Sequence, residues 1–155
     1  MNRLECIQAK SRYTSEPHLV LMVDRVPFDE VLDRLHPDRN LLGLIPTLLD
    51  CLIDQREREV VWTRILPPIG CSRVAPVLMC PDDCDLCCTV VVAEVEATES
   101  AISWHRLGID AAVEYTAPED VGKTVHWLEQ VGPFTFPRSD YEKCLSVLRE
   151  GLTTA

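Results

Sequence analysis

The chain has 155 residues, of which 46% are hydrophobic, so it can bury one substantial core but is short for two domains. Its 25 acidic and 15 basic residues give a formal net charge of −10 at pH 7. The basic residues do not gather into a stripe, which argues against direct binding of nucleic acid.

The longest apolar runs are no longer than strands, and the N-terminal segment has scattered charges without the apolar stretch of a signal peptide. We therefore expect a cytoplasmic protein without membrane association. In that reducing compartment, the eight cysteines are expected to remain free thiols instead of forming disulfides.

The first half of the chain combines one strand with helical patterns. Residues 1–16 show no regular period and are predicted to be irregular, whereas residues 19–23 form an apolar, strand-length run. Residues 27–66 are predicted to be mainly helical, because apolar side chains recur at helical spacing on both sides of a proline-rich break. Within this region, Asp54 and Glu57 have the spacing of a helix-capping box.

The second half changes to the strand period. Residues 74–128 are predicted to be mainly strand, as a meander of consecutive strands joined by short turns, with residues 122–128 suiting either a strand or a helical turn. Pro76 lacks an N–H to donate, which places it at a sheet edge or a bulge. Residues 139–150 are predicted to be a C-terminal helix that Gly151 ends.

These elements predict a single α+β domain over residues 1–155. We expect an antiparallel, meander-like sheet of three to five strands, packed on one face by amphipathic helices. A short hairpin loop at residues 97–100 would place Val95 beside Trp104 on the core face, and Glu96 beside Ser103 on the wet face.

The densest motif is the run of residues 80–88, which contains four cysteines and three aspartates. Cys84 and Cys87 have the separation of a zinc-ligand pair, and Cys80 is available to complete a metal site. However, the full spacing is not a standard zinc motif, and residues 81–83 are ordinary turn chemistry. We therefore expect no metal or other cofactor, and keep a small cysteine-ligated zinc domain as the alternative.

A second alternative is an enzyme that uses two histidines. His105 and His126 would serve as general acid and base if their strands brought them into one pocket. The chain contains no nucleophile elbow, phosphate loop or metalloprotease motif. Its expected function is therefore not catalytic.

The remaining feature is a surface rich in carboxylates. Five acidic side chains at two predicted hairpins are the expected contacts for a basic partner protein: Asp82, Asp83, Asp85, Glu94 and Glu96. Carboxylates arranged in this way match the lysine and arginine side chains of a cationic protein.

The second half of the chain also resembles a group of small uncharacterised bacterial proteins, some of which accompany polymorphic-toxin systems. The resemblance lies in five runs: Cys80-Pro-Asp-Asp, residues 88–96 (CTVVVAEVE), residues 104–110 (WHRLGID), residues 122–127 (GKTVHW) and Asp140-Tyr141. It implies a cytoplasmic immunity protein that binds and blocks the C-terminal domain of a secreted toxin. No catalytic residue is implied by it.

Overall fold

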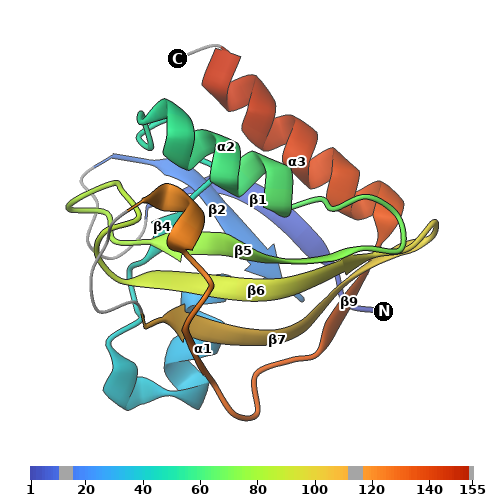
Figure 1. Cartoon of the computed structure of the whole chain (residues 1–155), viewed down its shortest axis with the longest axis horizontal. Helices are drawn as coiled ribbons and strands as arrows, with labels where there is room; N and C mark the ends of the chain where they lie inside the picture. The colour runs from blue at the N-terminus through green and yellow to red at the C-terminus, as the bar shows by residue number, and fades with distance from the viewer. Residues whose placement is uncertain (11–15, 112–116, 154–155) are drawn as a thin grey trace.

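The computed structural model describes residues 1–10, 16–111 and 117–153, and its largest feature is a six-stranded antiparallel sheet (Figure 1). The strands follow the order β4-β5-β6-β7-β8, and β9 also pairs with β7. Their bounds are β4 (Ile45–Pro46), β5 (Ser72–Met79), β6 (Val90–Ala97), β7 (Ala101–Asp110), β8 (Val125–Trp127) and β9 (Phe134–Pro137). The expected antiparallel sheet of an α+β domain is thus confirmed, although it has six strands.

A second, three-stranded antiparallel sheet was not expected. It consists of β1 (Leu4–Ala9), β2 (His18–Val23) and β3 (Val26–Pro27), in that order. The prediction that residues 1–16 are irregular is wrong for β1, in which Cys6 pairs with Leu21 of β2. Charged and polar side chains interrupt the apolar alternation of β1, so the pattern alone does not reveal it.

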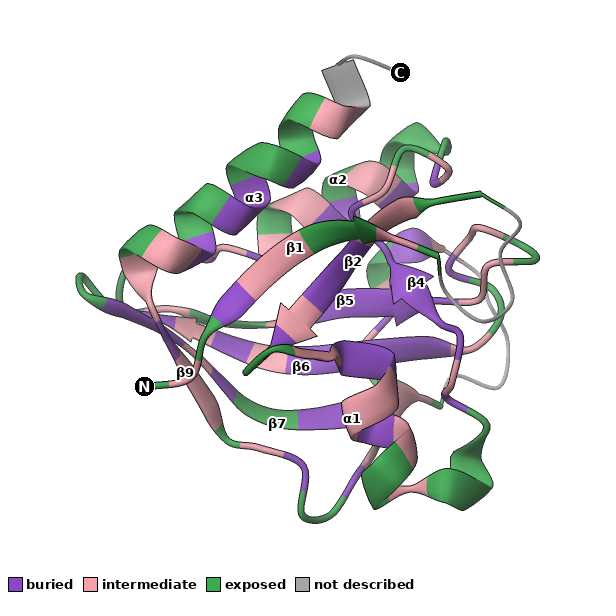
Figure 2. Cartoon of the chain, turned by 180° about the vertical axis from the view of Figure 1, so that it is seen from behind, coloured by how far each residue is buried: buried purple, intermediate pink, exposed green. Residues whose placement is uncertain are grey.

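Three α-helices and two short 3₁₀ turns complete the described part of the chain. Their bounds are α1 (Phe28–Leu35), η1 (Pro37–Arg39), α2 (Gln55–Arg64), η2 (Pro118–Asp120) and α3 (Arg138–Thr153). The small sheet and α1 lie on one side of the large sheet, behind it in Figure 1 and toward the viewer in Figure 2. In Figure 2, most of β5 and β6 is coloured as buried. None of the described helices combines the length and apolar content needed to cross a bilayer.

The core is built around Trp104 of β7. Its ring lies 5.4 Å from that of Phe28 in α1 and 5.1 Å from that of Phe136 in β9, measured between centroids. The fully buried Tyr141 hydroxyl accepts a hydrogen bond from Trp104 Nε1 (3.2 Å) and donates one to the carbonyl of Ile65 (2.6 Å). One side chain of α3 therefore joins β7 to the end of α2.

The predicted strand register is confirmed. Val95 pairs with Trp104 and Glu96 pairs with Ser103, as the short hairpin loop requires. The expected irregularity at Pro76 is also present, because the register between β5 and β6 shifts just after it. Residues 122–128, which suit either a strand or a helical turn by sequence, contain the strand β8.

Two details of the predicted helices are wrong. Within the region predicted to be mainly helical, residues 47–51 form turns, because Thr47 pairs with β5 by donating its N–H to Val77 (3.1 Å) and its hydroxyl to Pro76 (2.8 Å). The helix predicted over residues 139–150 runs from Arg138 to Thr153, so Gly151 lies inside it. By contrast, Asp54 caps α2 as expected, since its carboxylate accepts from the N–H of Glu57 (3.0 Å).

Gly108 allows β8 to lie close against β7. A Cβ atom at this position would meet Val125 Cγ1 at 2.4 Å and the His126 carbonyl oxygen at 2.8 Å. Gly108→Ala is therefore expected to displace β8 and to lower the free energy of unfolding by about 1–3 kcal/mol in urea denaturation. Gly151→Ala is the control, because its Cβ meets only Leu19 at 3.5 Å. Equal stability of the two variants would contradict the close packing of β8.

Candidate functional site

The cysteine-rich run of residues 80–88, called the thiol loop below, connects β5 to β6. The last paired residues of the two strands are Met79 and Val90. Cys80 directly follows β5 and Cys88 lies two positions before β6. Because antiparallel strands bring the two ends of their connection together, this hairpin places both thiols at the same end of the sheet.

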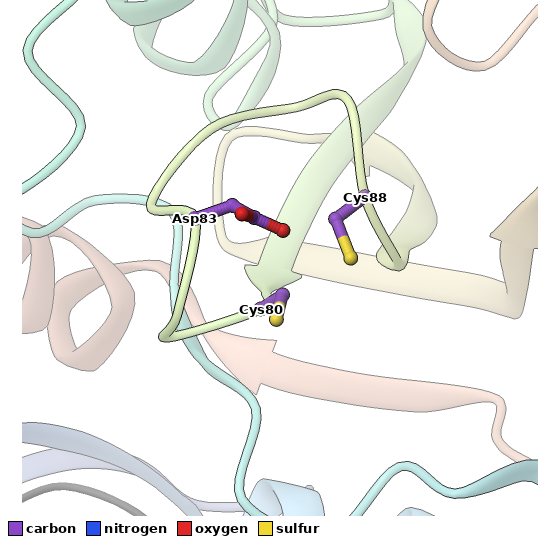
Figure 3. Close-up of side chains that lie close together, drawn as sticks. All are labelled: Cys80, Asp83 and Cys88. Carbon is purple, nitrogen blue, oxygen red and sulfur yellow. The ribbon is translucent and has the colours of Figure 1, made fainter.

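Three side chains of the kinds that can ligate a metal ion meet in this loop (Figure 3). Ligand atoms of Cys80, Asp83 and Cys88 all lie within 4.8 Å of one another. The predicted metal set shares only Cys80 with this group. Cys84 lies beside Cys51 instead, and the side chain of Cys87 is exposed outside the group.

Two thiols of this region, those of Cys51 and Cys88, are not set up as nucleophiles. Burial, followed by the nearby Cys84 thiol, raises the pKa of Cys51 to about 12. At Cys88, a hydrogen bond with the backbone of Thr89 lowers the pKa of the thiol. The effects of Asp83, burial and Cys80 raise it by more in total, so the pKa of Cys88 lies above the usual value. Both thiols are therefore protonated at neutral pH, whereas thiol catalysis requires a thiolate.

Hydrogen bonds to the backbone hold the thiol loop in place. The N–H of Cys84 donates to the Cys80 carbonyl (3.1 Å), and Cys84 has a left-handed φ of 47°. The buried Glu57 carboxylate of α2 accepts from the N–H of Leu86 (2.6 Å). Sequence reasoning did not find this bond, because the partner of Glu57 lies 29 positions away along the chain.

The five carboxylates predicted to bind a partner lie on two separate segments. Asp82, Asp83 and Asp85 belong to the thiol loop, and the first two are exposed. Glu94 and Glu96 lie on β6, where they pair with Arg106 (2.9 Å) and His105 (3.4 Å) of β7. The strand carboxylates therefore already face basic side chains of this chain.

A cavity of about 460 Å³ lies beside the thiol loop, between β2, the segment that follows β4, and the end of α3. Its wall includes Pro81 and Cys84 of the loop. Two carboxylates line it, Glu16 and Asp50, together with the apolar side chains of Leu19, Ile45, Leu49 and Leu148. Among the described residues, no lysine or arginine contributes to the lining. We call this cavity the carboxylate pocket.

The two histidines of the enzyme hypothesis do not meet. His126 pairs across the ladder with Ile109, which itself pairs with Val91 of β6. Val91 and Val95 share one face of β6, so the register shift between Ala93 and Val95 leaves Ile109 on the same face as Trp104, the partner of Val95. His105 directly follows Trp104 and points to the opposite face. His105 contacts Glu96, and His126 contacts Arg39. An acid–base pair formed by these two side chains is thus excluded.

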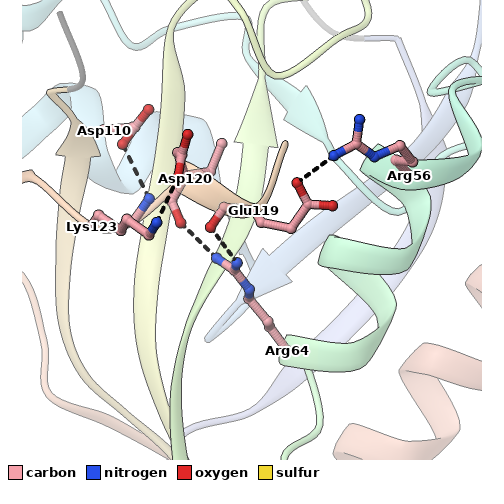
Figure 4. A network of polar contacts seen from close by, with 8 residues as sticks. Arg56, Arg64, Asp110, Glu119, Asp120 and Lys123 are labelled. Carbon is pink, nitrogen blue, oxygen red and sulfur yellow. Dashed lines mark hydrogen bonds and ion pairs between the residues drawn. The ribbon is translucent and has the colours of Figure 1, made fainter. Parts of the chain in front are cut away.

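Acidic residues near η2 serve to hold that segment on α2 (Figure 4). Glu119 pairs with Arg56 at 2.8 Å and accepts a bond from Arg64 at 2.9 Å through its backbone carbonyl. Asp120 pairs with Lys123 at 2.6 Å. These carboxylates are neutralised locally, so they differ from those of the thiol loop and the carboxylate pocket.

The group formed by Cys80, Asp83 and Cys88 adjoins the carboxylate pocket, because Pro81 and Cys84 of the same loop line the pocket. The first offers two sulfur ligands and one oxygen ligand, and the second offers an apolar cavity with negative charge. The thiols of Cys88 in the first and Cys51 in the second have raised pKa values, so these two are not activated nucleophiles. The chain matches no protein-family model, no curated protein and no solved structure.

Proposed function

We propose that this chain is a non-enzymatic binding protein that captures a cationic protein, as an immunity protein captures a toxin domain. The observation that carries the proposal is the carboxylate pocket. Lysine and arginine have long apolar stems and charged ends. A cavity lined by Leu19, Ile45 and Leu49 and bearing Glu16 and Asp50 suits both parts of such a side chain.

The charge around the pocket supports the same partner. Asp82 and Asp83 are exposed on the adjoining loop, and the whole chain has a formal net charge of −10. A negative surface of this kind accelerates the approach of a cationic protein and selects against anionic ones. Glu94 and Glu96 take part only as outer contacts in this proposal, because they are paired with His105 and Arg106.

A lysine-rich peptide of about ten residues is a suitable first probe. The double variant Glu16→Lys/Asp50→Lys is expected to weaken its binding at least about tenfold in isothermal titration at low salt, because two attractive charges become repulsive. The control is Asp38→Lys/Glu99→Lys, which changes the net charge equally at exposed sites outside the pocket. Equal losses in the two variants would show that overall charge, and not the pocket, binds the peptide.

A test of the immunity function requires the toxin domain that the chain would block. The proposal expects the neighbouring gene to encode a large secreted protein with a basic C-terminal domain. Adding this chain should abolish the toxicity of that domain in a growth assay, and the pocket variant should restore it. Undiminished toxicity in the presence of the wild-type chain would rule out immunity.

A further inference from the structure

We propose that Cys80, Asp83 and Cys88 form a zinc site at the end of the β5–β6 hairpin, with two sulfur ligands, one oxygen ligand and a fourth position open to solvent. This site is independent of the proposed capture of a cationic protein. It also differs from the set of three cysteines that the sequence suggests, because Asp83 and Cys88 replace Cys84 and Cys87.

The separations of the three side chains suit a small tetrahedral ion. With zinc–sulfur bonds of about 2.3 Å, the ligand atoms of a tetrahedral site lie roughly 3.5–4 Å apart. The ligand atoms here already lie within 4.8 Å of one another. Closing the group around an ion thus requires only small side-chain rotations, without rearrangement of the hairpin.

The surrounding loop is organised before any ion binds. Cys80 directly follows β5 and Cys88 lies two positions before β6, so the paired strand ends bring the two residues near each other. The bond from the Cys84 N–H to the Cys80 carbonyl closes the turn that carries Asp83. Leu86, on the other side of the turn, is anchored to Glu57 of α2. Preorganisation of this kind reduces the conformational entropy that ligands lose when they bind a metal.

The chemistry of the ligands selects the ion. Two thiolates and one carboxylate favour zinc over magnesium and calcium, which prefer sites made entirely of oxygen ligands. Three protein ligands with an open fourth position are the arrangement of accessible zinc sites. Asp83 and Cys88 are exposed, so an ion can enter from solvent. The bound ion would hold in place the loop that forms one wall of the carboxylate pocket.

The test uses the full chain, purified without a histidine tag and kept reduced. Cobalt(II) is titrated first, because thiolate ligands produce a charge-transfer band in the near ultraviolet, and zinc is then added in competition. We expect one equivalent of cobalt to bind with this band, and zinc to displace it. Binding of less than about half an equivalent of either metal would overturn the proposal.

Neighbouring residues in the loop provide matched controls. Cys88→Ser is expected to weaken zinc binding at least about 100-fold and Asp83→Asn at least about tenfold, whereas Cys87→Ser and Asp82→Asn should retain wild-type affinity. All four side chains are exposed, so none of these changes should prevent folding. Equal losses of zinc affinity in Cys87→Ser and Cys88→Ser, or in Asp82→Asn and Asp83→Asn, would overturn the assignment of ligands. Peptide binding to the carboxylate pocket is measured separately, so failure of one proposal is distinguishable from failure of the other.

Discussion

Replacing Tyr141 with Phe is expected to lower the free energy of unfolding by roughly 2–4 kcal/mol. The substitution leaves the ring packing in place but removes a hydroxyl that bonds to both Trp104 Nε1 and the Ile65 carbonyl. Both residues are almost completely buried, so water cannot readily replace the lost partner. Urea denaturation followed by tryptophan fluorescence measures the loss.

A double-mutant cycle separates the two hydrogen bonds of Tyr141. If Trp104→Phe and Tyr141→Phe are combined, the loss is expected to be smaller than the sum of the single losses, since each removes the same indole–hydroxyl bond. The remaining effect of Tyr141→Phe reports the bond to Ile65 at the end of α2. A change of less than about 0.5 kcal/mol in Tyr141→Phe would contradict a joining role for the hydroxyl.

Glu57→Ala is expected to produce a loss of similar size, roughly 2–4 kcal/mol, and to loosen the thiol loop. The Glu57 side chain is buried, and its carboxylate is the acceptor for the N–H of Leu86 at 2.6 Å. Removing it leaves a buried donor without that acceptor and creates a small cavity between α2 and the loop. Denaturation measures the stability, and faster hydrogen exchange at the Leu86 amide measures the release of the loop.

Glu59 offers a matched control for this variant. It lies on the same helix but is exposed, so Glu59→Ala should change stability by less than about 0.5 kcal/mol. Glu57→Gln keeps an oxygen acceptor and should recover part of the loss. Unchanged exchange at Leu86 in Glu57→Ala would show that the loop is held by its other contacts.

The strands of the large sheet were predictable because their signals are local. Alternating apolar residues and a short turn were enough to place Val95 opposite Trp104, and the missing N–H of Pro76 was enough to predict an irregularity. The turns at residues 47–51 were not predictable. Their apolar residues have helical spacing, but Thr47 bonds to a strand about thirty positions later.

The candidate sites depend even more on distant residues. The cysteine motif drew attention to the loop that contains the candidate ligand group, yet spacing alone favoured Cys84 and Cys87 over Cys88, whose position depends on where β6 begins. Asp83 was assigned to partner binding because a turn aspartate carries no separate signal for metal binding. The carboxylate pocket combines Glu16, Asp50 and Leu148, and no sequence pattern relates residues so far apart.

The outer side of β5 is closed to the addition of another strand. Pro76 has no N–H, the carbonyls of Pro76 and Val77 accept bonds from Thr47, and the Val74 carbonyl accepts one from Arg64 at 3.4 Å. An extended peptide therefore finds few free backbone groups along this side and cannot add itself to the sheet there.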